Sequence, residues 1–185
     1  MKILRFFIII FISLTTSIKA DLNKNLINQL EDGGKLIFIR HAYAPGNGDP
    51  NNFNLNDCST QRNLNSLGRK QAKNIGEFFR ENKIKIYKVL SSEWCRCKET
   101  ADIAFKDYST NSFLNSFYSS KYAKNKDKQV EALNNYVKKI NSNGNLIFVT
   151  HYVLISEVLN YGASSGEIVI SDKNFNIVGT VEIDY

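Results

Sequence analysis

Both histidines of the chain stand within two positions of the end of a short apolar run. His41 follows Arg40 after residues 35–39 (KLIFI), and His151 follows residues 145–149 (NLIFV) and a threonine. A neutral imidazole is a competent nucleophile, with an ordinary pKa of about 6.5. The guanidinium of arginine offers a planar fork of donors that matches phosphate oxygens. These residue types therefore indicate phosphoryl transfer, with a nucleophilic histidine beside a phosphate-binding cation.

The apolar runs alternate with helical patterns, which indicates how the chain folds. Near-continuous apolar strands that alternate with amphipathic helices are typical of a mostly parallel sheet covered on both faces. The predicted fold class is α/β, a three-layer α/β/α sandwich in one domain. The expected strands are 35–39, 86–90, 145–149, 167–170 and 176–183, and the expected helices are 66–81, 94–105, 130–143 and 153–159.

Such a sheet brings the candidate residues together. Ligands of open parallel sheets bind beyond the carboxyl ends of the strands. Arg40, His41 and His151 stand at two of these ends, and Arg96 comes soon after the strand at 86–90. A single histidine is usually a satisfied or exposed side chain, but chance would have to place both histidines of this chain at equivalent ends. We therefore expect one pocket with His41 as the nucleophile and with donors from the other three residues.

The segments around these residues resemble the signatures of a known family. They read IRHA at residues 39–42, LSSEWCRCKETA at 90–101 and VTH at 149–151. In this order they are similar to the motifs of the histidine phosphatase superfamily, also called phosphoglycerate-mutase-like. The resemblance extends over most of the chain, from about residue 35 to residue 170, and implies the three-layer sandwich of that family.

The resemblance also implies a role for each matched residue. His41 would become a phosphohistidine, Arg40 and Arg96 would bind the phosphate, and His151 would complete the pocket as the second catalytic histidine. No cofactor is implied. Ala42 stands where the family usually has glycine, and its methyl group is tolerable if the backbone there is not at positive φ.

A general acid cannot be assigned by matching. Larger members of the family have a glutamate after the second helix or an aspartate directly after the second histidine, whereas this chain has FLNSFYSS at residues 113–120 and Tyr152. Glu93 and Asp57 are the weak candidates, and surface or capping roles are favoured for each. General acid catalysis is typically worth about 10²–10⁴-fold, so its absence favours substrates whose leaving group needs little protonation.

Arg62 is a third arginine near the predicted pocket, in the loop of residues 46–64. Its guanidinium would either hold a second anionic group of the substrate or anchor the loop by pairing with Asp57 or a carbonyl. The sequence favours neither reading.

Residues 1–20 have the layout of a secretory signal peptide, with a basic start, an apolar run over residues 6–14 and a polar stretch that closes on Ala20. We expect cleavage after Ala20, export to the periplasm or the exterior, and a mature domain of residues 21–185. Ile18 is larger than the small residue usual at its position, so an uncleaved anchor is the alternative. The apolar run is far shorter than the roughly 20 residues of a membrane span, and none is expected after cleavage.

Loss of the leader removes three basic residues and no acidic one, which lowers the formal net charge from +6 to +3. The densest basic stretch, residues 121–128, lacks interleaved aromatic residues beyond one tyrosine and is read as a solvated loop. We therefore expect a small phosphorylated substrate and no nucleic-acid partner. The oligomeric state stays open.

Three cysteines, Cys58, Cys95 and Cys97, belong to a chain expected in an oxidising compartment. Cys95 and Cys97 are too close to bridge each other comfortably, so Cys58 is expected to pair with one of them. A structural zinc site needs four ligands in recognisable pairs, which the chain does not offer, and we predict no metal.

The favoured interpretation is a metal-independent phosphatase that acts through a phosphohistidine on His41. A module of the same fold that binds phosphate but has lost turnover is the alternative. A mutase is a weaker reading, because isomerisation normally needs enclosing segments and the glutamate that this short chain lacks.

Overall fold

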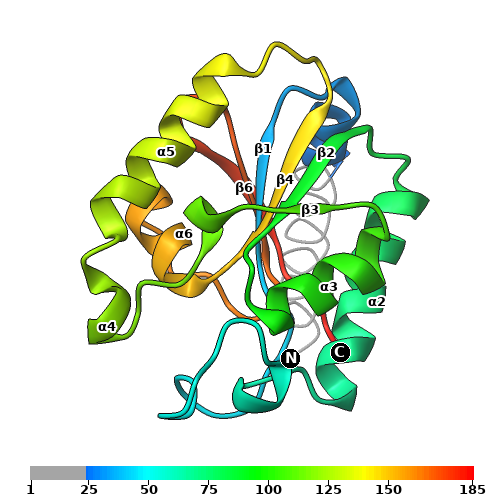
Figure 1. Cartoon of the computed structure of the whole chain (residues 1–185). Helices are drawn as coiled ribbons and strands as arrows, with labels where there is room; N and C mark the ends of the chain where they lie inside the picture. Colours follow the sequence, from blue (N-terminus) through cyan, green and yellow to red (C-terminus); the bar gives the residue numbers. More distant parts are fainter. Residues whose placement is uncertain (1–23) are drawn as a thin grey trace, which may run out of the picture.

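The computed structural model describes residues 24–185, which fold around a single six-stranded sheet (Figure 1). The predicted leader, residues 1–20, lies outside the described residues. No helix within residues 24–185 is long and apolar enough to cross a membrane.

The sheet has the strand order β3-β2-β4-β1-β5-β6. Strands β3, β2, β4 and β1 run parallel to one another, and β5 and β6 extend the sheet in the antiparallel sense. The predicted mostly parallel sheet is therefore confirmed. The strands are β1 (Leu36–Arg40), β2 (Ile86–Ser91), β3 (Ser109–Thr110), β4 (Asn145–Thr150), β5 (Ile168–Ser171) and β6 (Ile177–Val181).

Helices cover both faces of the sheet, as the apolar strands require. Helices α5 and α6 lie on one side and α2 and α3 on the other (Figure 1). Residues 24–32 are also helical. The other helical elements are η1 (Cys58–Thr60), α2 (Ser66–Glu81), α3 (Cys95–Phe105), η2 (Ser112–Leu114), α4 (Ser120–Ala123), α5 (Lys126–Lys139) and α6 (Tyr152–Leu159).

Alternate residues of the central strands build two separate cores. In β1, Ile37 and Ile39 pack among side chains of α2 and α3, whereas Leu36 and Phe38 pack among side chains of α5 and α6. This division follows from the period of two along a strand, which sends neighbouring side chains to opposite faces. Because both cores are buried, the central strands are held firmly from above and below.

The register of the central strands brings their carboxyl ends level. Arg40 of β1 pairs with Thr150 of β4, so the residues that follow emerge side by side. The backbone N–H of His41 donates to the carbonyl of Thr150 at 2.9 Å, and that of Ser92, just after β2, donates to the carbonyl of Val149 at 2.9 Å. The sheet thus carries its hydrogen-bond ladder one residue into the predicted site.

Helix α5 differs from the helix expected at residues 130–143. It begins at Lys126 and ends at Lys139, because Ile140 has left the helical conformation with φ −77° and ψ 115°. The expected end at residue 143 is therefore wrong, and residues 143–144 lie directly before β4, in the connection from the helix to the sheet.

Candidate active site

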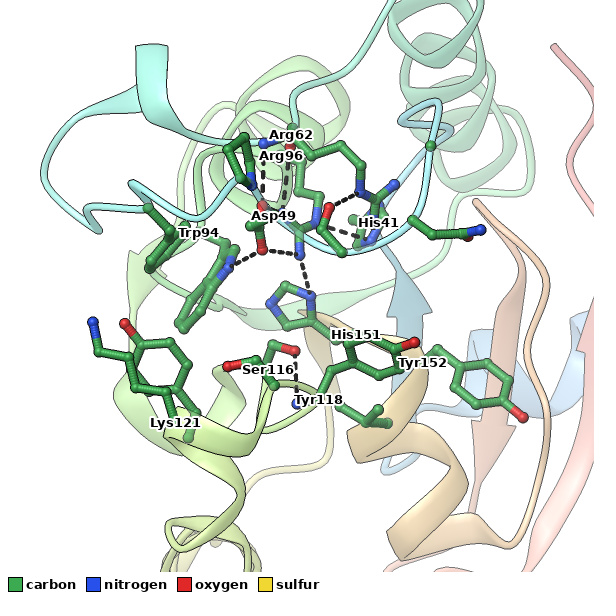
Figure 2. Close-up of a pocket in the computed structure, with 18 of the residues that line it drawn as sticks. His41, Asp49, Arg62, Trp94, Arg96, Ser116, Tyr118, Lys121, His151 and Tyr152 are labelled. Atoms are coloured by element: carbon green, nitrogen blue, oxygen red, sulfur yellow. Dashed lines mark hydrogen bonds and ion pairs between the residues drawn. The ribbon is translucent and has the colours of Figure 1, made fainter.

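A pocket of about 680 Å³ opens at the carboxyl edge of the parallel strands (Figure 2). Its lining comes from the end of β1 and the loop after it, from the start of α3, from residues 116–122, and from residues 151–153 after β4 at the start of α6. The structure places all five predicted catalytic and binding residues in this lining, namely Arg40, His41, Arg62, Arg96 and His151.

His41 is 2 % exposed and has two distinct ring nitrogens. Its Nδ1 lies 2.8 Å from the carbonyl oxygen of Ala42, which can only accept, so Nδ1 carries the proton. Its Nε2 then has a free electron pair, toward which Arg96 Nε donates at 3.1 Å. Burial, followed by the charge of Arg96, holds the pKa of His41 well below its usual value. The imidazole is therefore neutral and presents Nε2 as a nucleophile.

The backbone after His41 is fixed by three partners from the helices. The N–H of Ala42 donates to Thr100 Oγ1 at 3.0 Å, and that of Tyr43 donates to Gln71 Oε1 at 2.9 Å. At Gly68 a Cβ atom would lie 1.9 Å from the carbonyl oxygen of Tyr43, so only glycine allows α2 to pack this closely. Ala42 is buried and is not among the residues with positive φ, so its methyl group is accommodated.

All five N–H bonds of the Arg96 guanidinium have an acceptor within reach. Its Nε and Nη2 atoms approach the two histidines, with Nη2 3.5 Å from His151 Nδ1. Its Nη1 and Nη2 atoms also donate to Asp49 Oδ1 at 2.7 Å and Oδ2 at 3.2 Å, and Nη1 reaches the carbonyl of Arg62 at 3.3 Å. Asp49 therefore holds the end of the guanidinium while one edge faces His41 and His151.

His151 is buried and belongs to a chain of hydrogen bonds that leads away from the pocket. Its Nε2 lies 2.9 Å from Ser92 Oγ, which donates in turn to Asn115 Oδ1 at 3.0 Å. Because the Ser92 hydroxyl uses its proton on Asn115, Nε2 of His151 is the donor in the first contact. Burial, then the charges of Arg96 and His41, hold the pKa of His151 well below its usual value. In this arrangement the second histidine is neutral.

Arg40 and Arg62 approach the pocket in different ways. Arg40 donates through Nη1 to the carbonyl of Ala163 at 2.9 Å, while its Nε is buried with no hydrogen-bond partner among the described residues. Arg62 donates through Nε to the carbonyl of Gly48 at 3.0 Å and through Nη1 to the carbonyl of Ala44. Arg62 thus anchors the loop through carbonyls and still lines the pocket.

Solved structures of other proteins share this architecture. Phosphoglycerate mutase from Thermus thermophilus superposes with a TM-score of 0.59 at 15 % identity, over 81 % of this chain and 99 % of that one. The fold is phosphoglycerate-mutase-like. The protein histidine phosphatase SixA, solved with tungstate, has a TM-score of 0.53 at 13 % identity over 81 % and 96 %. The product of Rv3214 from Mycobacterium tuberculosis has a TM-score of 0.56 at 14 % identity over 81 % and 96 %.

A comparison with protein families matches a shorter part of the chain than the structural comparisons do. Residues 36–114 match the histidine phosphatase superfamily (branch 1). This span contains Arg40, His41 and Arg96, and His151 lies beyond it. No curated protein sequence matches the chain significantly.

Neither weak candidate for the general acid lies in the pocket of this phosphoglycerate-mutase-like fold. Asp57 caps η1, where its carboxylate accepts from the backbone N–H of Ser59 at 2.9 Å. Glu93 accepts from Asn115 Nδ2 at 2.6 Å, at the far end of the chain of hydrogen bonds from His151. Neither side chain is among the lining residues.

Asp49 is the one carboxylate that lines the pocket within residues 24–185, and sequence reasoning missed it. It also accepts from Trp94 Nε1 at 3.0 Å and from the backbone N–H of Arg62 at 3.1 Å. Burial alone raises the pKa of Asp49, but the hydrogen bond and charge of Arg96 bring it below its usual range. No local pattern distinguishes Asp49 from Asp57 in this loop, so the sequence carries no signal for its role.

A disulfide attaches the loop after β1 to the start of α3. The structure pairs Cys58 with Cys95 and leaves Cys97 as a free, buried thiol. Burial raises the pKa of Cys97 to about 12, so this thiol stays protonated. The bridge ends one residue before Arg96, and it therefore fixes the loop beside that guanidinium.

No group of three or more metal-ligating side chains occurs within the part of the chain that the structure describes.

Proposed function

We propose that the protein is an exported member of the histidine phosphatase superfamily that hydrolyses a small phosphorylated compound through a phosphohistidine on His41, without a metal. The observation that carries this proposal is the state of His41. Its imidazole is neutral and its Nε2 points at Arg96 Nε, between donors suited to phosphate oxygens. The match of residues 36–114 to the superfamily supports the same reading.

In the first step, Nε2 of His41 attacks phosphorus and the bond from phosphorus to the leaving oxygen breaks, with its electron pair going to that oxygen. Before this attack, Arg96 Nε turns from the histidine to a phosphate oxygen, which frees the electron pair of Nε2. The buried Nε–H of Arg40, which has no acceptor among the described residues, is a second donor for the phosphate. Positioned cationic donors of this kind supply most of the stabilisation in phosphoryl transfer.

The carbonyl of Ala42 assists this step from the other side of the ring. Attack at Nε2 leaves a positive charge on the imidazole, and the Nδ1–H bond to this carbonyl at 2.8 Å stabilises that charge. Water then attacks the phosphohistidine, and the bond between nitrogen and phosphorus breaks with its electron pair returning to Nε2. Phosphate leaves and His41 is neutral again.

The test is formation of an acid-labile phosphoprotein. Incubation with a labelled phosphoester or acetyl phosphate should label the wild-type chain and not His41→Ala, and hydrolysis by that variant should fall by about 10³-fold or more. Activity should be unchanged by a chelator. A His41→Ala protein that still hydrolyses at the wild-type rate, or a wild type silenced by the chelator, would refute the proposal.

A phosphate-binding module without turnover is the second candidate, and one observation favours it. Within residues 24–185 the single carboxylate of the pocket, Asp49, is engaged by four donors and held anionic, so it is a poor proton donor. Tungstate, a tetrahedral oxyanion that the solved SixA protein contains, is a suitable probe. Tungstate binding that survives His41→Ala, together with no hydrolysis across a broad panel, would select this candidate. The mutase reading remains weaker, since it also needs a proton donor.

Export is part of the proposal, and the disulfide supports it. Structural disulfides persist in oxidising compartments such as the periplasm and the exterior. The Cys58–Cys95 bridge would be at risk of reduction in a reducing cytoplasm. Mass spectrometry of the exported protein should find a chain that begins at Asp21. A chain that keeps residues 1–20 would indicate the uncleaved anchor instead.

A further inference from the structure

We propose that the substrates are aryl phosphates, that is, phosphate monoesters whose leaving group is a phenol-type oxygen. This inference rests on the proposed function and names the substrate class for the same pocket. Two independent features lead to it: an aromatic wall beside the phosphate-binding residues, and a lining in which residues 24–185 supply no carboxylic acid that is free to donate a proton.

The aromatic wall consists of Phe53, Trp94 and Tyr122. The rings of Phe53 and Trp94 are stacked with centroids 5.1 Å apart, and Tyr122 meets both edge-on, at 5.9 Å from Phe53 and 5.7 Å from Trp94. All three residues line the pocket, and Phe53 and Tyr122 are only partly buried. Such a wall offers stacked and edge-on contacts to a planar ring, and contacts of this kind stabilise a bound ring beyond the burial of its apolar area.

The wall begins directly beside the phosphate-binding residues. The ring of Trp94 lies edge-on to His151 with centroids 5.4 Å apart, and its Nε1–H donates to Asp49, which holds Arg96. A substrate ring that is attached close to the phosphorus therefore lies within reach of this wall. An aryl phosphate meets this condition because one oxygen joins its ring to phosphorus. In a nucleotide, a ribose stands between the base and its phosphates.

The opposite side of the pocket is also aromatic. Tyr152, at the start of α6, is 46 % exposed, and its ring lies 5.5 Å from the guanidinium carbon of Arg40. Tyr118 lines the pocket while being 69 % exposed. In Figure 2, Trp94 and Tyr152 lie on opposite sides of His151. A flat leaving group can thus be bordered on both sides as it departs.

The need to protonate the leaving oxygen points to the same substrate class. A phenol has a pKa of about 10, whereas an alkoxide leaves with a basicity near that of hydroxide, since water has a pKa of about 15.7. When Nε2 of His41 bonds to phosphorus, the electron pair of the breaking bond can stay on a phenolate oxygen without a proton from the protein. The phenolate then takes a proton from water. Asp49, held anionic by Arg96, is not required as an acid.

The experiment compares the hydrolysis of four phosphates, which separates the effect of an aromatic ring from the effect of a good leaving group. Phenyl phosphate has both the ring and the good leaving group, 2-phenylethyl phosphate has only the ring, acetyl phosphate has only the leaving group, and propyl phosphate has neither. We expect kcat/KM for phenyl phosphate to be at least about 10²-fold higher than kcat/KM for 2-phenylethyl phosphate. A factor of this size corresponds to the rate that a general acid would contribute for the poorer leaving group. We expect the KM for phenyl phosphate to be about tenfold below that for acetyl phosphate.

Variants of the wall test the ring contacts directly. In the double variant Phe53→Leu with Tyr122→Leu, the ratio of kcat/KM for phenyl phosphate to that for acetyl phosphate should fall about tenfold, because two aromatic contacts are lost. The matched control is Tyr87→Leu, a half-exposed tyrosine on β2 outside the pocket lining, which should leave this ratio unchanged. The wild-type panel decides the question even if the double variant fails to fold.

Several outcomes would overturn the inference while the proposed function stands. Equal rates for phenyl and 2-phenylethyl phosphate would reveal a proton donor, and a KM for acetyl phosphate at or below that of phenyl phosphate would remove the role of the ring. A kcat/KM for a nucleoside diphosphate more than tenfold above that for phenyl phosphate would show that the aromatic wall binds a nucleotide base. Failure to hydrolyse any of these compounds, with no phosphohistidine formed, would instead refute the proposed function.

Discussion

The two sides of the pocket are held in place by different forces. The strand-end side, with Arg40, His41 and His151, continues the ladder of a parallel sheet that two apolar cores enclose. The loop side, residues 42–65, is held by polar side chains, by the bridge from Cys58 to α3 and by a small apolar cluster that it forms with α2. In the proposed mechanism the strand-end side therefore carries the reacting groups on rigid backbone, and the loop side adjusts their positions. Changes on the first side should abolish turnover, whereas changes on the second should reduce it.

A matched pair of arginine variants tests this comparison most strongly. Arg40→Gln removes a charged donor at the end of β1, and kcat/KM should fall by about 10²–10³-fold, the usual loss for a donor aimed at transition-state charge. Arg62→Gln removes a loop arginine that donates to two carbonyls, and the fall should be about tenfold. Steady-state kinetics on phenyl phosphate measures both. Equal losses would show that Arg62 binds substrate as directly as Arg40 does.

Asp49→Asn addresses the contact between the two sides. The variant loses the ion pair that fixes the Arg96 guanidinium, with its 2.7 Å contact, and kcat should fall by roughly 10–10²-fold because small misplacements cost about that much. The affinity for tungstate should not fall, since a negative charge beside the oxyanion is removed. Isothermal titration and kinetics separate these effects.

The control for this prediction is Asp57→Asn, which removes a carboxylate from the same loop outside the pocket lining. It should leave kcat unchanged. If Asp49→Asn lowers kcat and tungstate affinity together, Asp49 supports the structure of the pocket in general and does not specifically position Arg96.

The strand-end side could be predicted from the sequence because its signals are local. Apolar runs locate β1, β2 and β4, and the residues that follow them must meet at one edge once the strands are parallel. His41, His151, Arg40 and Arg96 were found in this way. The bounds of these strands were predicted to within one residue, since a buried strand begins and ends with its apolar run.

The loop side could not be predicted in the same way because its contacts join residues distant in the chain. Asp49 acquires its role from Arg96, 47 positions later, and from the ring nitrogen of Trp94. The choice of Cys95 over Cys97 as the partner of Cys58 depends on which face of α3 turns toward the loop. The aromatic wall likewise joins three segments, at residues 53, 94 and 122, that no sequence period connects.

Removal of the disulfide should loosen the loop side alone. The double variant Cys58→Ser with Cys95→Ser loses a bridge between residues 37 positions apart, which should lower the free energy of unfolding by roughly 2–4 kcal/mol. Urea unfolding measures this loss, and activity should fall less than in Arg40→Gln. Reductant should bring the wild type to the stability of the double variant and leave the double variant unchanged. A wild type that is insensitive to reductant would show that the bridge does not limit the loop.

The smallest expected effect is the pH dependence of stability that the strand-end side produces. Burial, then Arg96, lowers the pKa of both His41 and His151 in the folded state, while the unfolded chain keeps ordinary values near 6.5. As the pH falls below about 6.5, the unfolded state therefore binds protons that the folded state does not, and the free energy of unfolding decreases. The slope can reach at most about 1.4 kcal/mol per pH unit for each histidine.

These are the two histidines of the whole chain, and the pKa of Asp49 lies below its usual range, so unfolding measured between pH 7 and pH 5.5 reports mainly on this pair. Replacing His151 by asparagine should remove about half of the slope. Stability that stays flat over this interval would mean that the folded protein takes up the same protons. His41 and His151 would then be accessible to water in the folded protein, and the strand-end side would be no more rigid than the loop side.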